Sequence, residues 1–275
     1  MVRIAAVGTA EQYSSVGRLE ELQERRAYEC RLTPDRALET LDDAEAFLRD
    51  RGMLTRTTDS ALPSLFEACH EDAYAPGSPG FGQWPATKFP WFGELGERGY
   101  LILKVHRGKS LLVTDDVAVL LDPIVRAELV RMEESAPDWA MLLRHLAAAG
   151  PSTLDDLQTE LGLKPKELKA IRYPLERCGA VVARSLVYAA GEGHAHTAEL
   201  SRWDQAFPAA DDGDLQSDQA LADLVVAGVR AAVVAPEREL GKWFSWPWYW
   251  DEALVDTLVR DGRLERVHGH VAIPA

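Results

Sequence analysis

The sequence predicts a helix-rich α+β protein made of tandem winged-helix units with small β-hairpin wings. Two observations support this prediction. Apolar residues recur at helical spacing in segments that alternate with short strand-like runs. The order helix, helix, turn, helix, strand, glycine turn, strand occurs in the middle of the chain and a similar order recurs at its C-terminal end. This order is typical of a winged helix.

The middle unit is the most regular. Residues 139–149 carry a helical stripe of leucines that Gly150-Pro151 ends, and Thr153 with the acids after it is typical of the start of a second, short helix. A third helix is predicted from Pro165 to Arg177, since proline suits a first helical turn. Pro174 lies inside this helix and is expected to end or bend it.

A strand over 181–188, a glycine turn at 191–193 and a return strand from His194 complete the middle unit. The C-terminal unit is predicted to contain helices over 220–234, 236–244 and 250–260. A hairpin around His268-Gly269 follows them.

The N-terminal region is predicted to contain the same kinds of helices and hairpin, with a long insertion between them. Helices are expected over 33–51 and 62–69, and a hairpin over 100–114. A loop rich in glycine, proline and aromatic residues occupies 75–90, and a third helix is expected to start near Trp91. The predicted domains are 1–132, 133–208 and 209–275, with the acidic stretch 209–218 as the best linker.

Composition excludes several classes of protein. The 275 residues are 47% hydrophobic and 27% charged, as in an ordinary globular chain. No run approaches the roughly 20 apolar residues of a membrane helix, so no membrane contact and a cytoplasmic location are expected. Three scattered cysteines without a CxxC pair indicate neither a disulfide framework nor a zinc site. Neither a Walker loop nor a GxGxxG motif occurs, so no metal or cofactor is predicted.

Charge is distributed unevenly along the chain. The net charge of −14 argues against a simple duplex-binding protein, because phosphate contacts need lysine and arginine. Residues 163–188, however, hold six basic and two acidic residues, a net charge of +4. Such a local excess can form a small nucleic-acid footprint.

Eight residues are therefore candidates for contact with double-stranded DNA. Those near the third helix and the strand of the middle unit are Lys164, Lys166, Lys169, Arg172 and Arg184. Those at the N-terminal hairpin turn are His106, Arg107 and Lys109. In a winged helix the third helix enters the major groove and a basic wing touches phosphates. The alternative is that both segments are simply solvated, charged surface.

Four tryptophans are candidates for stacking against a base, because proteins that extrude a base need an aromatic surface for it. Trp84 and Trp91 belong to the N-terminal aromatic loop, and Trp246 and Trp248 to the aromatic run 243–250. The alternatives are that the first pair holds the loop to the body and that the second pair fills a core between units.

Tandem winged helices in a chain of this size resemble the AlkZ/YcaQ-like family of bacterial DNA glycosylases. The most suggestive segments are 152–186 and 250–273, within an architectural resemblance over 33–275. The family's catalytic signature is a Gln-apolar-Gln or Gln-apolar-Asp triplet in its first winged unit. The comparable stretch, 52–57, reads Gly-Met-Leu-Thr-Arg-Thr and lacks it, so the chain looks like a divergent relative.

Two functions follow from these observations. The first is a DNA-binding protein associated with repair. Any base excision would need a carboxylate or amide near the sugar, and Gln83 and Glu94 are the candidates. The second is a non-catalytic winged-helix module that binds a protein partner, which the acidic net charge allows.

Overall fold

The computed structural model describes residues 10–73, 84–190, 193–208 and 217–275. It confirms a helix-rich α+β fold with three small antiparallel sheets of three strands each. The strand orders are β1-β3-β2, β4-β6-β5 and β7-β9-β8. In every sheet the last strand in sequence lies in the middle and pairs with both others, which is the topology of a winged helix.

Each sheet belongs to a unit with the same order of elements. The first unit comprises α2 (Leu41–Arg51), β1 (Met53–Thr55), α3 (Leu65–Ala68), α4 (Trp91–Glu97), β2 (Leu101–His106) and β3 (Lys109–Val113). The second comprises α6 (Pro137–Ala149), β4 (Ser152–Thr153), α7 (Leu154–Leu161), α8 (Pro165–Arg177), β5 (Val181–Ala190) and β6 (Gly193–Arg202). The third comprises α10 (Ser217–Ala232), β7 (Val234–Pro236), the 3₁₀ helix η2 (Glu237–Lys242), α11 (Leu254–Arg260), β8 (Glu265–Val267) and β9 (His270–Ala272).

A long helix, α5 (Asp115–Ser135), connects the first unit to the second and packs along α10 of the third. Its inward face, which includes Leu121, Ile124 and Val125, is fully buried. One continuous hydrophobic cluster therefore extends from the first sheet through α5 to α8 and α10. Burial of this shared apolar surface holds the three units together.

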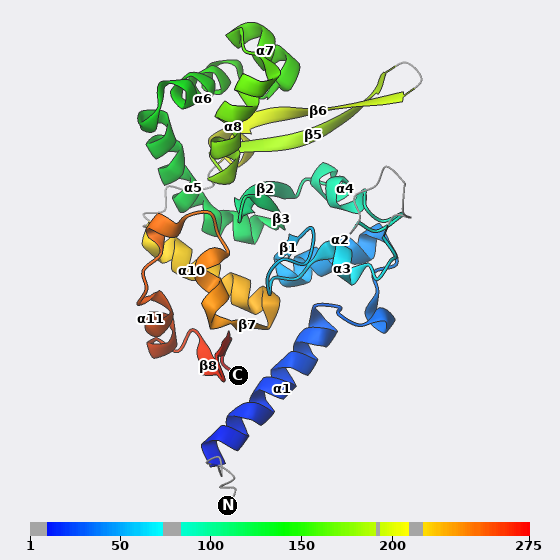
Figure 1. Cartoon of the computed structure of the whole chain (residues 1–275), viewed down its shortest axis with the longest axis vertical. Helices are drawn as coiled ribbons and strands as arrows, with labels where there is room; N and C mark the ends of the chain where they lie inside the picture. The colour runs from blue at the N-terminus through cyan, green and yellow to red at the C-terminus, as the bar shows by residue number, and fades with distance from the viewer. Residues whose placement is uncertain (1–9, 74–83, 191–192, 209–216) are drawn as a thin grey trace, which may run out of the picture.

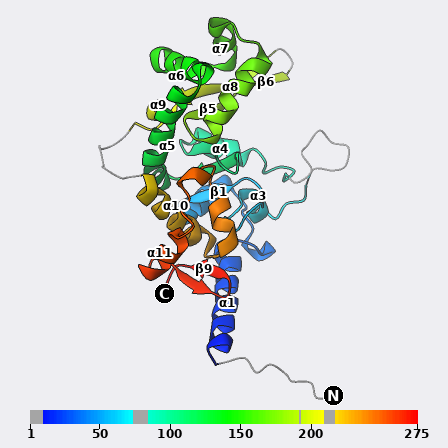
Figure 2. The ribbon, with the colours of Figure 1, turned by 60° about the vertical axis from the view of Figure 1, so that its left-hand side comes forward.

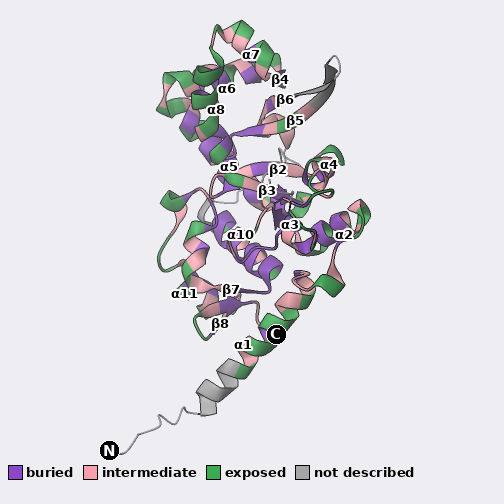
Figure 3. Cartoon of the chain, turned by 45° about the vertical axis from the view of Figure 1, so that its right-hand side comes forward, coloured by how far each residue is buried: buried purple, intermediate pink, exposed green. Residues whose placement is uncertain are grey.

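The remaining elements lie around this core. They are α1 (Ala10–Glu29), the 3₁₀ helices η1 (Pro34–Arg36) and η3 (Pro247–Tyr249), and α9 (Trp203–Ala206). Figures 1 and 2 both show α1 at one end of the molecule and α7 at the other. Leu22 of α1 is buried against the third sheet, and Figure 3 shows buried residues concentrated along α10 and the sheets.

Several expected elements differ from those observed. Pro174 does not end its helix, because α8 continues to Arg177 and the buried Leu175 anchors the last turn. The expected helix 236–244 is instead the 3₁₀ helix η2, which directly follows the strand β7, and the expected helix over 250–260 begins only at Leu254. The sequence reasoning also missed α1, α5 and the first strand of each unit.

The predicted domain boundary after residue 132 falls inside α5, near its C-terminal end. The predicted linker 209–218 lies almost wholly outside the described residues, since α10 begins at Ser217.

Gly228 of α10 provides a test of the packing between α10 and η2. A methyl group there would lie 2.7 Å from Cζ3 of the buried Trp243 ring, too close for contact without a shift. We expect Gly228→Ala to lower the free energy of unfolding by about 1–3 kcal/mol in urea denaturation.

Gly93→Ala in α4 is the matched control, because a methyl group added there would have no described atom within 4 Å. This control should be neutral or stabilising by about 0.5–1 kcal/mol. Equal effects of the two substitutions would contradict the packing described for Gly228.

Candidate nucleic-acid interface

The outer face of α8 exposes two lysines and one arginine. The helix turns Leu168, Ile171 and Leu175 into the core, and the 3.6-residue period then points the intervening residues outward. The exposed residues of this side include Lys166, Lys169, Tyr173 and Arg177, with Ala170 between them. We call Lys166, Lys169, Tyr173 and Arg177 the basic face of α8.

The charges of this face are not neutralised within the part of the chain that the structure describes. Many lysines and arginines elsewhere pair with carboxylates, as Arg25 pairs with Glu29 and Arg144 with Glu133. No described carboxylate lies within ion-pair distance of the side-chain nitrogens of Lys166, Lys169 or Arg177. At the N-cap, the carboxylate of Glu167 accepts a hydrogen bond from the backbone N of Lys164 at 2.8 Å. The basic face of α8 therefore presents uncompensated positive charge.

The wing of the first unit lies against the C-terminal end of this face. Gly108 at the wing tip has a φ of +74°, and a methyl group there would lie 3.0 Å from Nε of Arg177 and 3.5 Å from Oη of Tyr173. The positive φ favours glycine at position 108, and the nearby Arg177 side chain leaves little room for a larger residue.

Residues on both sides of the wing tip are engaged within the protein. Arg107 donates to the carbonyl oxygens of Asp59 (2.6 Å) and Lys242 (3.0 Å). Lys109 donates to the Asp59 carboxylate at 3.0 Å, although its side chain stays 57% exposed. Arg107 and Lys109 are thus held by the loop at Asp59, and the charge of Lys109 is paired there.

His106 does not lie on this surface, because its side chain is fully buried. Its Nε2 lies 3.2 Å from Oδ1 of Asp59 and 3.3 Å from Oγ of Ser60. Burial lowers the pKa of His106 and outweighs the opposing effect of Asp59. A neutral, buried imidazole cannot contact a phosphate, so the expectation for His106 is corrected to a structural role.

Two other candidates are committed to internal ion pairs. Arg172 binds Glu176 at 2.7 Å, and Glu176 is 2% exposed and also pairs with Lys104 of β2. Arg172 thus compensates a buried carboxylate where α8 meets the first sheet. Arg184 on β5 is largely exposed and pairs across the hairpin with Glu199 of β6 at 3.0 Å.

Three of the four tryptophan candidates are packed into the protein. Trp246 is buried, and its Nε1 donates to the Cys178 carbonyl at 3.1 Å, which corrects its expected role as a stacking surface. Trp84 and Trp91 are half-buried against the core of the first unit. The Trp84 ring stacks on Phe89 at a centroid distance of 6.4 Å.

Trp248 differs from the other three, because it is 52% exposed. Its Nε1 donates at 2.9 Å to Oε1 of Glu128, a carboxylate on α5 with no exposed surface. Arg131 binds both oxygens of the same carboxylate, at 2.9 and 2.6 Å, and its guanidinium lies 4.6 Å from the indole centroid. Burial and Glu128 also raise the pKa of the adjacent Tyr249 to about 12.

The stretch 52–57, where the resemblance would place the glycosylase triplet, makes internal contacts in the first unit. All three residues of β1 are buried, and Thr55 donates from Oγ1 to the Pro63 carbonyl at 3.2 Å. The guanidinium of Arg56 lies over the rings of Trp84 and Phe92, at 5.1 and 4.7 Å. Glu94 is half-buried on α4, and Gln83 lies outside the described residues.

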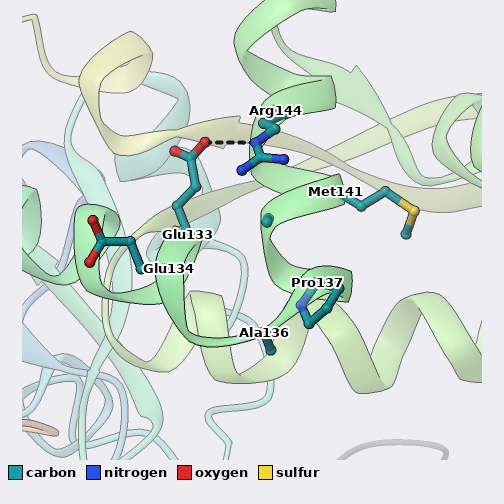
Figure 4. A pocket seen from close by; sticks show the side chains of 7 residues that line it. Glu133, Glu134, Ala136, Pro137, Met141 and Arg144 are labelled. Atoms are coloured by element: carbon teal, nitrogen blue, oxygen red, sulfur yellow. Dashed lines mark hydrogen bonds and ion pairs between the residues drawn. The ribbon is translucent and has the colours of Figure 1, made fainter.

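Other kinds of site find no support in the described residues. No group of three or more His, Cys, Asp or Glu in the described ranges is arranged to hold a metal ion. Within those ranges, no helix has the length and apolar character needed to cross a membrane. A shallow hollow at the corner of α5 and α6 is lined by Glu133, Glu134 and Arg144, with Glu133 and Arg144 paired at 3.1 Å (Figure 4). Its two carboxylates would repel an anionic ligand.

Sequence reasoning missed Tyr173 and Arg177 as members of the interface. Their spacing from Lys166 and Lys169, in steps of three or four, was the available signal. Lys242 was also missed, and only the folded structure places its backbone beside the first wing.

The comparisons with known proteins agree with this architecture. No protein-family model and no curated protein matches the sequence. Among solved structures, the chain is similar to Streptomyces sahachiroi DNA glycosylase AlkZ. The TM-score is 0.54 at 15% identity, over 92% of this chain and 68% of AlkZ. The chain shares the AlkZ fold. At this identity the likeness extends to the fold alone.

The buried His106 predicts a pH dependence of stability. Its pKa is lowered on folding, so the unfolded chain takes up the proton first as the pH falls through about 6.5. The stabilising contribution of the neutral imidazole is complete above that pH and is lost below it. We expect the free energy of unfolding to fall between pH 7.5 and 5.5, measured by urea denaturation.

His106→Gln is the comparison that isolates this residue. The variant should be less stable than the parent at pH 7.5, yet lose less stability on acidification. Parallel pH profiles for the two proteins would show that His106 is not the titrating group.

Proposed function

We propose that this chain binds double-stranded DNA through the basic face of α8, as a protein associated with DNA repair. The uncompensated charge of Lys166, Lys169 and Arg177 supports this most directly, because it occurs in a chain with a net charge of −14. The chain has an excess of carboxylates, yet these three cations have no ion-pair partner among the described residues. Unpaired cations on a surface attract an anionic partner.

The position of α8 in its unit supports the same proposal. It is the third helix of a winged helix, the element that enters the major groove with its N-terminal residues toward the bases. Pro165 begins the helix, and Lys164 and Lys166 flank it at the end that would face the groove. Lysines act there as point charges for phosphates.

The repair association comes from the fold. AlkZ, which has the same architecture, is a DNA glycosylase. Two proteins with the same fold can bind the same class of partner and still differ in the reaction they catalyse, because function depends on the residues of the site. The shared fold therefore supports DNA as a partner and does not by itself support base excision. We also propose that the chain is organised as three domains, 1–132, 133–208 and 209–275.

Substitution of the two outward lysines tests the proposal. We expect the parent to bind a duplex of about 20 base pairs with a log–log salt slope near −4 to −5, as about five phosphate contacts predict. Lys166→Ala/Lys169→Ala should flatten the slope by about 2 and weaken binding to all sequences similarly, in fluorescence anisotropy titrations.

The double variant Arg25→Ala/Arg144→Ala is the matched control. It removes the same charge from exposed side chains that already pair with carboxylates. If both double variants lose the same duplex affinity, the loss reflects net charge alone and contradicts a specific role for Lys166 and Lys169. Absence of duplex binding by the parent at low salt would instead support a winged-helix module for a protein partner.

A separate assay addresses base excision. Because β1 is buried where the glycosylase triplet would lie, we expect binding to duplexes with alkylated purines without accumulation of abasic sites. Gel electrophoresis after alkaline cleavage measures these sites. Abasic product that disappears in Glu94→Gln or Gln83→Ala would contradict this expectation and identify a residue needed for catalysis.

A further inference from the structure

The segment that leads to Trp248 is hydrogen-bonded to the first wing and to the C-terminal end of α8. In this segment, Ser245 donates from its backbone N to Val105 O at 2.8 Å and accepts at Oγ from Gly108 N at 3.3 Å. Trp246 then donates to the carbonyl of Cys178, the C-cap residue of α8. Trp248 follows two residues later, and its side chain lies against Glu128 and Arg131 of α5.

The indole of Trp248 is held rigidly by internal contacts. Its only polar group is satisfied by Glu128, whose carboxylate is fully buried and also binds Arg131 in a bidentate manner. An indole whose N–H is already used can offer an external partner only its ring. About half of the residue nevertheless remains exposed.

The guanidinium of Arg131, which is paired with Glu128, lies beside this exposed ring. This guanidinium lies 4.6 Å from the ring centroid and is 43% exposed, and its Nη1 makes no hydrogen bond to any residue in the described ranges. A stacking surface next to a cation that can meet a phosphate is how proteins hold unpaired nucleotides.

We propose that Trp248, with Arg131, is a stacking site for an unpaired or extruded base of the DNA held by the basic face of α8. The inference rests on the proposed duplex binding and adds the substrate class: DNA with a base outside the helical stack. A flat aromatic ring accepts any base, so the site selects unpaired structure rather than sequence.

The experiment compares two duplexes that differ only in one bulged 2-aminopurine. This base fluoresces strongly when unstacked and is quenched by stacking on an aromatic ring. The parent protein should bind the bulged duplex about tenfold more tightly than the perfect duplex and quench its fluorescence. Trp248→Leu keeps an apolar side chain but should lose both the preference and the quenching.

Tyr28→Leu is the matched control. Tyr28 is 60% exposed and also lies under an arginine, with the Arg36 guanidinium 4.0 Å from its centroid, but it belongs to the distant α1. This variant should keep the preference and the quenching. Trp248→Phe, which retains a ring, should keep part of both and shows that the site folds.

The outcomes separate the two proposals. Equal affinity of the parent for the two duplexes, or unchanged quenching in Trp248→Leu, would overturn the stacking site while perfect-duplex binding sustains the DNA-binding proposal. Failure of the parent to bind either duplex would overturn both. Loss of the preference in Trp248→Leu with unchanged perfect-duplex affinity supports the stacking site.

Discussion

The attachment of the first wing inside the molecule determines how the three units are arranged. Arg107 and Gly108 at its tip contact the loop at Asp59, the segment Lys242 to Ser245 of the third unit, and Arg177 on α8. A wing in a winged helix is otherwise available to touch phosphate or the minor groove. This wing instead serves as an internal joint, while Lys166 and Lys169 on the outer face of α8 stay exposed.

Buried charge strengthens the same junction. Glu176 joins α8 to the first sheet through Lys104 and Arg172, and Glu128 joins α5 to the third unit through Trp248. A buried carboxylate is costly unless it is paired and hydrogen-bonded, so these partners are held in place. The pairing also explains why Arg172 is withdrawn from the surface while Lys166 and Lys169 remain unpaired.

The shared fold with AlkZ and the altered first unit have different consequences. The two proteins share a fold, and in this chain three small sheets surround one hydrophobic core. The segment 52–57, where the resemblance to the glycosylases would place their triplet, holds a buried strand followed by Arg56 packed against Trp84 and Phe92. The fold is therefore shared without the residues of that triplet.

Local pattern was enough to establish the α+β class, the order of elements around α8 and the outward direction of Lys166 and Lys169, because helical periodicity is a property of neighbouring residues. It could not reveal the first strand of each unit, since strands of two or three residues carry no period. It also could not assign His106, Trp246 or Trp248 to burial or exposure. The side chains that decide this come from distant positions, such as Glu128, 120 residues before Trp248. Only folding brings such groups together.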